Sequence, residues 1–130
     1  MNKMTKIDNA IKTATRDYRG QTLEVMELVG NKWTLLLTYY LGEHTRRFSD
    51  LKRLAHPISS KMLTQTLREL ERFGMINRSV ISTTPPSVEY ELTELGRTFL
   101  SAASVICAWT RDNSEALEAA RKRYEAAAKA

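Results

Sequence analysis

The chain has 130 residues, of which 42% are hydrophobic and 27% are charged, a balance typical of a folded globular protein. Its 20 Lys and Arg outnumber 15 Asp and Glu, and the net charge of +5 weakly indicates an anionic partner. The only cysteine, Cys107, excludes a disulfide within the chain, and no apolar run is long enough to span a bilayer. We therefore expect one cytoplasmic domain over residues 1–130, with no membrane partner.

The N-terminal part of the sequence predicts two short amphipathic helices. A narrow apolar stripe predicts the first helix over residues 4–18, and Gly20 is expected to end it. Thr22 is expected to cap the second helix, which would stop at Gly30. Because so narrow a stripe is marginal in isolation, the first helix is expected to pack against another chain.

A third helix is predicted over residues 32–41, with Asn31 as its N-cap and Gly42 as its stop. It is apolar over much of its circumference, which is typical of a helix at the centre of a domain. Its aromatic residues, with one from later in the chain, are expected in the core: Trp33, Tyr39, Tyr40 and Trp109. The alternative, a pocket between subunits for a small-molecule effector, is left open.

Two closely spaced helices follow. After a short extended piece at residues 45–48, Ser49 would cap a helix over residues 50–55, which a proline ends because the residue before proline avoids the α region. The next helix would begin at Ser59 as N-cap and end at Gly74 in the left-handed C′ position. So short a turn between two helices predicts a helix-turn-helix, whose second helix enters the DNA major groove.

The second of these helices has two contrasting faces. One face is a predicted buried stripe made of Leu63, Leu67, Leu70 and Phe73. The other, called here the reading face, carries hydroxyl, amide and cationic groups that can bind base edges or phosphates: Ser59, Ser60, Lys61, Thr64, Gln65, Arg68 and Arg72. Gln65 and Arg68 are the best candidates for base contacts, since they match adenine and guanine edges. The alternative is a solvated amphipathic helix without a partner.

Positive charge gathers around this helix. Between Arg46 and Arg78, eight Lys and Arg stand against three Asp and Glu, as expected for a surface that meets phosphates. Three of the cations outside the reading face are expected to contact phosphates rather than bases, with solvated surface charge as the alternative; they are Lys52, Arg53 and Arg78.

Beyond Gly74 the pattern changes from helical to alternating. Residues 75–81 and 88–92 predict the two strands of a β-hairpin, which must pack on the helices because two strands alone are marginal in water. The connection at 82–87 has turn chemistry, and its weaker candidates for DNA contact are Thr83, Thr84 and Ser87.

The C-terminal part predicts two more helices. Thr93 would cap a long helix reaching Trp109, and an Ala-rich helix would span residues 115–128. The long helix carries two adjacent apolar stripes, which indicates contact beyond its own domain. Cys107 lies on one stripe, which favours an inert buried thiol over a reactive one. Neither histidine has a ligand partner at helical spacing, so no metal site, cofactor or catalytic set is expected.

Several sequence blocks, taken together and in this order, resemble the HxlR family of bacterial regulators. The blocks are Lys32-Trp33-Thr34, residues 47–52, residues 58–64, residues 85–96 and Trp109. The resemblance covers about residues 22–110. It implies a MarR-like winged helix-turn-helix, mainly α with a small β-hairpin wing, that acts as a transcription factor and not as an enzyme.

The resemblance also implies a homodimer that binds double-stranded DNA at an inverted repeat. The wing would reach the minor groove or phosphates, and segments 1–20 and 94–130 would dimerise around the core at 22–93. The family often carries a redox-sensing cysteine followed by proline before its first shared helix, but Gly20-Gln21 stand there, which excludes sensing by that thiol. A winged-helix protein-interaction module that does not bind DNA is the alternative function.

Overall fold

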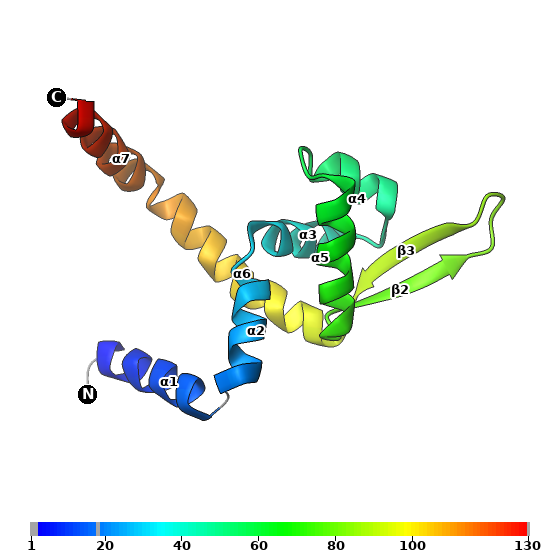
Figure 1. Ribbon diagram of the computed structural model, residues 1–130, viewed down its shortest axis with the longest axis horizontal. Helices are drawn as coiled ribbons and strands as arrows, with labels where there is room; N and C mark the ends of the chain where they lie inside the picture. Colours follow the sequence, from blue (N-terminus) through cyan, green and yellow to red (C-terminus); the bar gives the residue numbers. More distant parts are fainter. Residues whose placement is uncertain (1–2, 18, 130) are drawn as a thin grey trace.

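The computed structural model describes residues 3–17 and 19–129 (Figure 1). Its helices are α1 (Lys3–Asp17), α2 (Arg19–Val29), α3 (Lys32–Glu43), α4 (Phe48–Leu54), α5 (Ser60–Arg72), α6 (Glu94–Asp112) and α7 (Ser114–Lys129). Its strands are β1 (Arg46–Arg47), β2 (Ile76–Ile81) and β3 (Ser87–Leu92). The predicted order of helix-turn-helix, hairpin and long helix is therefore confirmed.

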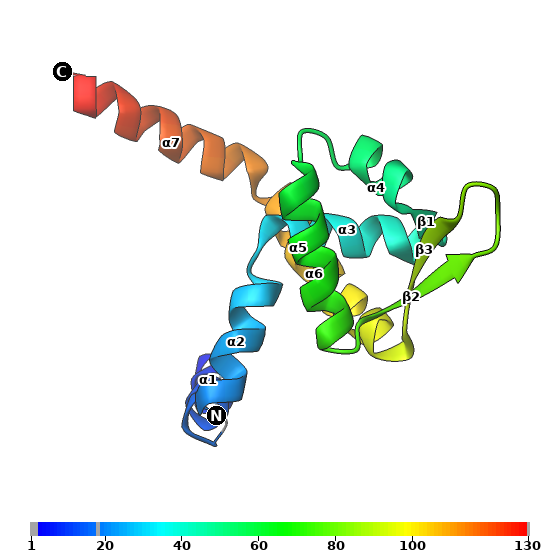
Figure 2. The same ribbon diagram turned by 45° about the vertical axis from the view of Figure 1, so that its right-hand side comes forward.

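The three strands form one antiparallel sheet in the order β1-β3-β2 (Figure 2). The predicted hairpin is β2 and β3, paired from Ile76 opposite Leu92 to Ile81 opposite Ser87. The extended piece before α4 becomes β1 and pairs with β3, placing Arg46 opposite Tyr90. The sequence did not predict this third strand, because two residues are too few to show an alternating pattern.

The core lies where α3, α5 and the sheet meet. The predicted stripe of α5 is confirmed, since Leu63 and Leu70 are fully buried and Leu67 nearly so, while Phe73 is half-buried at its edge. They pack with fully buried Leu37 of α3 in one cluster that also holds Leu51, Ile76 and Tyr90. Burial of this stripe leaves the opposite side of α5 facing outward.

Both ends of α5 are held by the predicted caps. The Ser59 hydroxyl accepts a hydrogen bond from Met62 N at 3.0 Å. At the other end Gly74 adopts a φ of +73°, and its N–H donates to Glu71 O while Met75 N donates to Leu70 O. These two bonds make a Schellman motif, in which glycine is favoured because a side chain would strain the left-handed backbone.

One junction holds the end of α5, the hairpin and α6 together. The Thr93 hydroxyl donates to Gly74 O at 2.6 Å and accepts from Gly96 N at 3.0 Å, so this residue caps α6 as predicted. A side chain at Gly96 would collide with the Met75 carbonyl, which shows how closely α6 approaches the chain leaving α5. The position of α5 relative to the wing therefore depends on this contact.

Three predicted helix boundaries are wrong. Gly20 does not end a helix, and Thr22 does not cap one, because α2 begins at Arg19 and includes both; residue 18 lies outside the described residues. Gly42 lies inside α3, where a side chain would collide with Leu100 of α6, so it permits helix packing rather than stopping the helix. A helical glycine costs only about 1 kcal/mol, which packing can offset.

The predicted cap of α4 is also wrong. That helix begins at Phe48, and the residue in the N-cap position is Arg47 rather than Ser49. The Asp50 carboxylate accepts a hydrogen bond from Arg47 N at 3.2 Å, so an acidic residue in the first turn holds the helix start.

The terminal helices α1 and α7 extend from one side of the core, and the wing extends from the opposite side (Figure 1). The second half of α6 leaves the core, so Cys107 is exposed and its predicted burial is wrong. Core placement is also wrong for Tyr39 and Trp109, which are 55% and 57% exposed, while Trp33 and Tyr40 pack against the core. None of the described helices combines the length and apolarity needed to cross a membrane.

Candidate nucleic-acid interface

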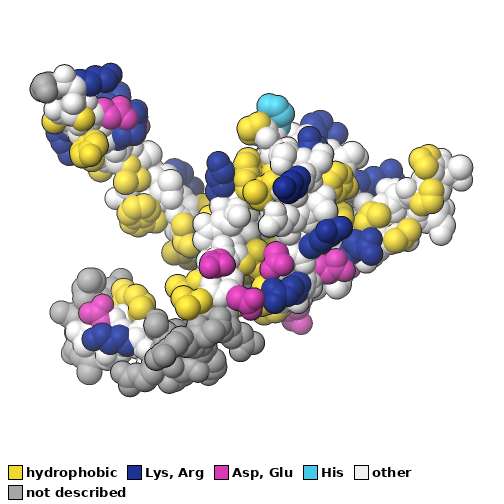
Figure 3. Space-filling model, viewed as in Figure 1, with side chains coloured by type: hydrophobic (Ala, Val, Ile, Leu, Met, Phe, Trp, Pro, Cys, Tyr) yellow, Lys and Arg dark blue, Asp and Glu magenta, His cyan; other side chains and the backbone are white. Residues whose placement is uncertain are grey.

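The reading face lies along the outer side of α5, away from the buried stripe. Its members are exposed except Thr64, which is half-buried. In Figure 3 Lys and Arg side chains are spread over the surface formed by α4, α5 and the base of the wing. This arrangement presents hydroxyl, amide and cationic groups from one rigid helix, as a major-groove reader requires.

The cations of α5 differ in their ion pairs. Among the described residues Lys61 and Arg68 form no ion pair, so their donors are free for a ligand. Arg72 instead contacts Glu24 of α2 at 3.3 Å and Glu69 at 3.1 Å. Hydrogen bonding and attraction from Glu24, and then from Glu69, raise the pKa of Arg72. The structure thus separates Arg72 from the free cations of the reading face.

Acidic residues border the reading face on the side next to α2. Glu24 and Glu27 of α2 and Glu69 of α5 line a hollow between these helices that Gln65 also borders. Acidic side chains gather in this region in Figure 3. Since carboxylates repel phosphates, nucleic acid would approach α5 from the side of α4 and the wing.

The three predicted phosphate contacts lie on either side of α5. Lys52 is half-buried on α4 and has no ion pair among the described residues, whereas Arg53 beside it contacts Asp50 at 3.4 Å. Arg78 on β2 lies 3.8 Å from Glu71 of α5. These exposed pairs are weak, typically worth less than about 1 kcal/mol, so a phosphate can compete for Arg53 and Arg78.

The wing tip carries no charged residue between Ser79 and Val88, so it offers only hydroxyl and backbone groups to a ligand. The Thr83 hydroxyl already donates to Pro85 O at 2.7 Å, which braces the turn. A hollow lies between this tip and the start of α4, lined by the predicted residues Thr83, Thr84 and Ser87 together with Arg47, Phe48, Ser49, Pro85, Pro86 and Val88.

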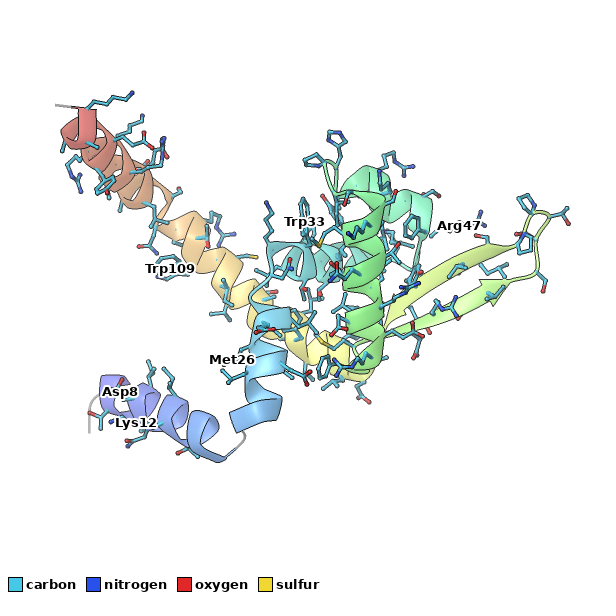
Figure 4. The ribbon with its side chains drawn as sticks, in the orientation of Figure 1. Asp8, Lys12, Met26, Trp33, Arg47 and Trp109 are labelled. Carbon is cyan, nitrogen blue, oxygen red and sulfur yellow. The ribbon has the colours of Figure 1, made fainter. Side chains whose placement is uncertain are left out.

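Arg47 is the cation of this hollow, and the sequence pattern alone did not indicate it as a site residue (Figure 4). It is the last residue of β1, directly before α4, and is half-exposed, with its guanidinium 3.8 Å from the Glu89 carboxylate. The pairing of β1 with β3 brings it beside the wing, and that pairing could not be derived from a two-residue strand. Arg47 therefore lies beside the wing hydroxyls only because the chain folds in this way.

Comparisons with known proteins agree with this geometry. A family model described as HxlR-like helix-turn-helix matches residues 28–118. The HTH-type transcriptional regulator YtcD of Bacillus subtilis strain 168 is 48% identical over 94 residues, which is 72% of this chain and 75% of that protein. YdeP of the same strain is 41% identical over 110 residues, covering 82% of this chain and 86% of its own.

Solved structures show the same fold. The transcriptional regulator YtfH from Salmonella typhimurium matches with a TM-score of 0.73 at 37% identity, covering 78% of this chain and 90% of that one. The redox regulator HypR in its reduced form matches with a TM-score of 0.68 at 37% identity, over 73% and 94% of the two chains. The predicted winged helix-turn-helix is confirmed, and the relatives are regulators rather than enzymes. The chain therefore belongs to the HxlR family of DNA-binding helix-turn-helix transcriptional regulators.

Proposed function

We propose that the protein is a sequence-specific regulator that binds an inverted repeat as a homodimer, with α5 in the major groove. The observation that carries this proposal is the reading face: Lys61 and Arg68 form no ion pair with any described residue, and they lie on a helix whose other side is buried in the core. Arg68 and Gln65 would read base edges. Lys61, Ser59 and Ser60 at the helix start would hold a phosphate, which the helix dipole also favours.

The remaining contacts would position the protein on the duplex without selecting bases. Lys52, Arg53 and Arg78 would neutralise phosphates on either side of the groove, and Arg47 joins them from the base of the wing. Thr83, Thr84 and Ser87 of the wing would reach the adjacent minor groove or its backbone. Because charged groups are absent from the wing tip, these contacts would add less to the salt dependence than the arginines.

Dimerisation through the terminal helices is supported by apolar side chains that the chain itself leaves uncovered. At least half of the surface of Ile11, Met26, Val105, Ile106 and Trp109 is exposed, and Ile7 and Leu23 are similar. Met26 and Trp109 are marked in Figure 4, on α2 and α6. A monomer rarely exposes so many large apolar groups on neighbouring elements, and a second copy would bury them.

The proposal is tested by selecting bound duplexes from a random library with the purified full chain. Enrichment of a two-fold symmetric sequence, with half-sites about one helical turn or a multiple apart, is expected because the two copies would be related by a two-fold axis. Recovery of a single asymmetric site would contradict the homodimer, and recovery of no sequence at all would contradict specific binding.

A further inference from the structure

A small polar hollow separates α5 from the base of the wing. It is lined by Thr64, Leu67, Arg68, Glu71, Arg78 and Tyr90. Thr64 and Arg68 also belong to the reading face, so the hollow adjoins the surface proposed to meet DNA. Two arginines and one glutamate leave an excess of positive charge around it, although the Glu71 carboxylate lies 3.8 Å from Arg78.

Tyr90 forms the floor of this hollow. Its position on β3 is directly opposite Arg78 of β2, and opposed residues of antiparallel strands point to the same face of the sheet. The residue is 9% exposed and belongs to the hydrophobic core cluster. The charges of Arg78, Glu71 and Arg68 all act on the hydroxyl, which places the polar end of the ring among the lining side chains.

No hydrogen bond joins the Tyr90 hydroxyl to another residue of 3–17 or 19–129, and the hydroxyl is not among the fully buried unpartnered atoms, so it reaches solvent through the hollow. A hydroxyl that opens to solvent beside two cations, with no partner in the described part of the chain, can donate to an external acceptor. Burial raises the pKa of Tyr90, an effect that Arg78 and Arg68 partly oppose and Glu71 reinforces. The hydroxyl consequently remains protonated at neutral pH and can donate.

We propose that Tyr90 is a DNA-positioning residue whose hydroxyl donates a hydrogen bond to a backbone phosphate seated between α5 and the wing. Arg78 and Arg68 supply the positive charge around that phosphate, and the rigid strand fixes its position relative to the reading face. The inference rests on the proposed function and adds to it one neutral contact. The sequence alone does not indicate Tyr90 as a DNA contact, because an aromatic residue at an inward strand position ordinarily belongs to the core.

The test is Tyr90→Phe, which removes the hydroxyl and keeps the ring. Affinity of the purified full chain is measured by fluorescence anisotropy on a duplex recovered by selection and on a random duplex, over a range of salt concentrations. Tyr39→Phe is the matched control, because Tyr39 is an exposed tyrosine of α3 outside the hollow and the reading face.

The expected result has three parts. Tyr90→Phe weakens binding to both duplexes by roughly tenfold for each protomer in contact with the duplex, as for the loss of one hydrogen bond to a charged group. The slope of log affinity against log salt stays that of the wild type, because a neutral donor releases no counterion. The melting temperature does not fall, since the hydroxyl has no hydrogen-bond partner to lose among the described residues, and Tyr39→Phe behaves as the wild type.

Two outcomes overturn the inference alone. Wild-type affinity in Tyr90→Phe would show that the hydroxyl touches no phosphate, and a loss of affinity matched by a lower melting temperature would assign it a purely structural role. Failure of the wild type to bind either duplex would instead overturn the proposed function, and the Tyr90 contact with it.

Discussion

Arg68 and Arg72 lie one helical turn apart on α5, and their different partners lead to different predictions. Arg68 is exposed and has no ion pair within the described residues, whereas Arg72 is held by Glu24 and Glu69. Replacing Arg68 by alanine therefore breaks no ion pair or hydrogen bond within the described part of the chain. Such surface changes alter the free energy of unfolding by about 0.5 kcal/mol or less, so a loss of affinity would report on DNA contact alone.

The expected loss for Arg68→Ala is about 1–3 kcal/mol per half-site, the value of one good bidentate contact to a base. That range corresponds to an increase in Kd of roughly 5- to 150-fold for each half-site. Base preference should relax at one position, because only guanine offers the two acceptors that a guanidinium can bind together. Arg72→Ala should leave base preference intact and lower the melting temperature slightly, since its two ion pairs are solvent-exposed.

Both variants are compared with the wild type by anisotropy on the selected duplex and on duplexes altered at single positions. Thermal melting of the same samples separates folding from binding. Relaxed base preference in Arg72→Ala, or unchanged affinity and preference in Arg68→Ala, would refute the division of these two arginines into a structural and a reading residue.

Three further predictions test the phosphate contacts, the α5–α6 junction and the dimer. Lys52→Ala should weaken all duplexes alike and reduce the salt slope by about 0.9 for each half-site, so a sequence-selective loss would argue against a phosphate contact. Gly96→Ala should cost about 1–3 kcal/mol of stability in thermal melting because the added methyl group meets the rigid Met75 carbonyl; Gly42→Ala meets only the mobile end of a leucine and should cost less. Trp109→Ala should raise the dimer dissociation constant roughly 30-fold or more in sedimentation equilibrium, and an unchanged constant would place the interface elsewhere.

Local sequence signals predicted the helix-turn-helix well because its determinants are local. Ser59 and Gly74 mark the two ends of α5 through capping chemistry, and the stripe from Leu63 to Leu70 is buried as its spacing indicates. Thr93 likewise caps α6 as predicted. Each of these features depends on residues within one or two turns of each other, so no knowledge of the tertiary fold is needed.

Features that depend on distant parts of the chain could not be predicted in this way. From the sequence alone Gly42 predicts the end of a helix, because its contact with Leu100 of α6 is not visible there. Arg47 lies beside the wing only because the two-residue strand β1 pairs with β3. Cys107 lies on an apolar stripe that the chain leaves exposed, because periodicity shows which face is apolar and not what covers it. Arg72 looked equivalent to Arg68 because Glu24, its partner, lies far away in sequence.

Equilibrium competition at physiological salt shows whether α5 reads base sequence. Labelled duplex recovered by selection is displaced from the purified full chain by the same duplex without label, or by random duplex. We predict that the random competitor is needed at roughly a thousandfold higher concentration or more, with affinity for both falling steeply as salt rises. Equal competition by the two duplexes would show that α5 does not read base sequence.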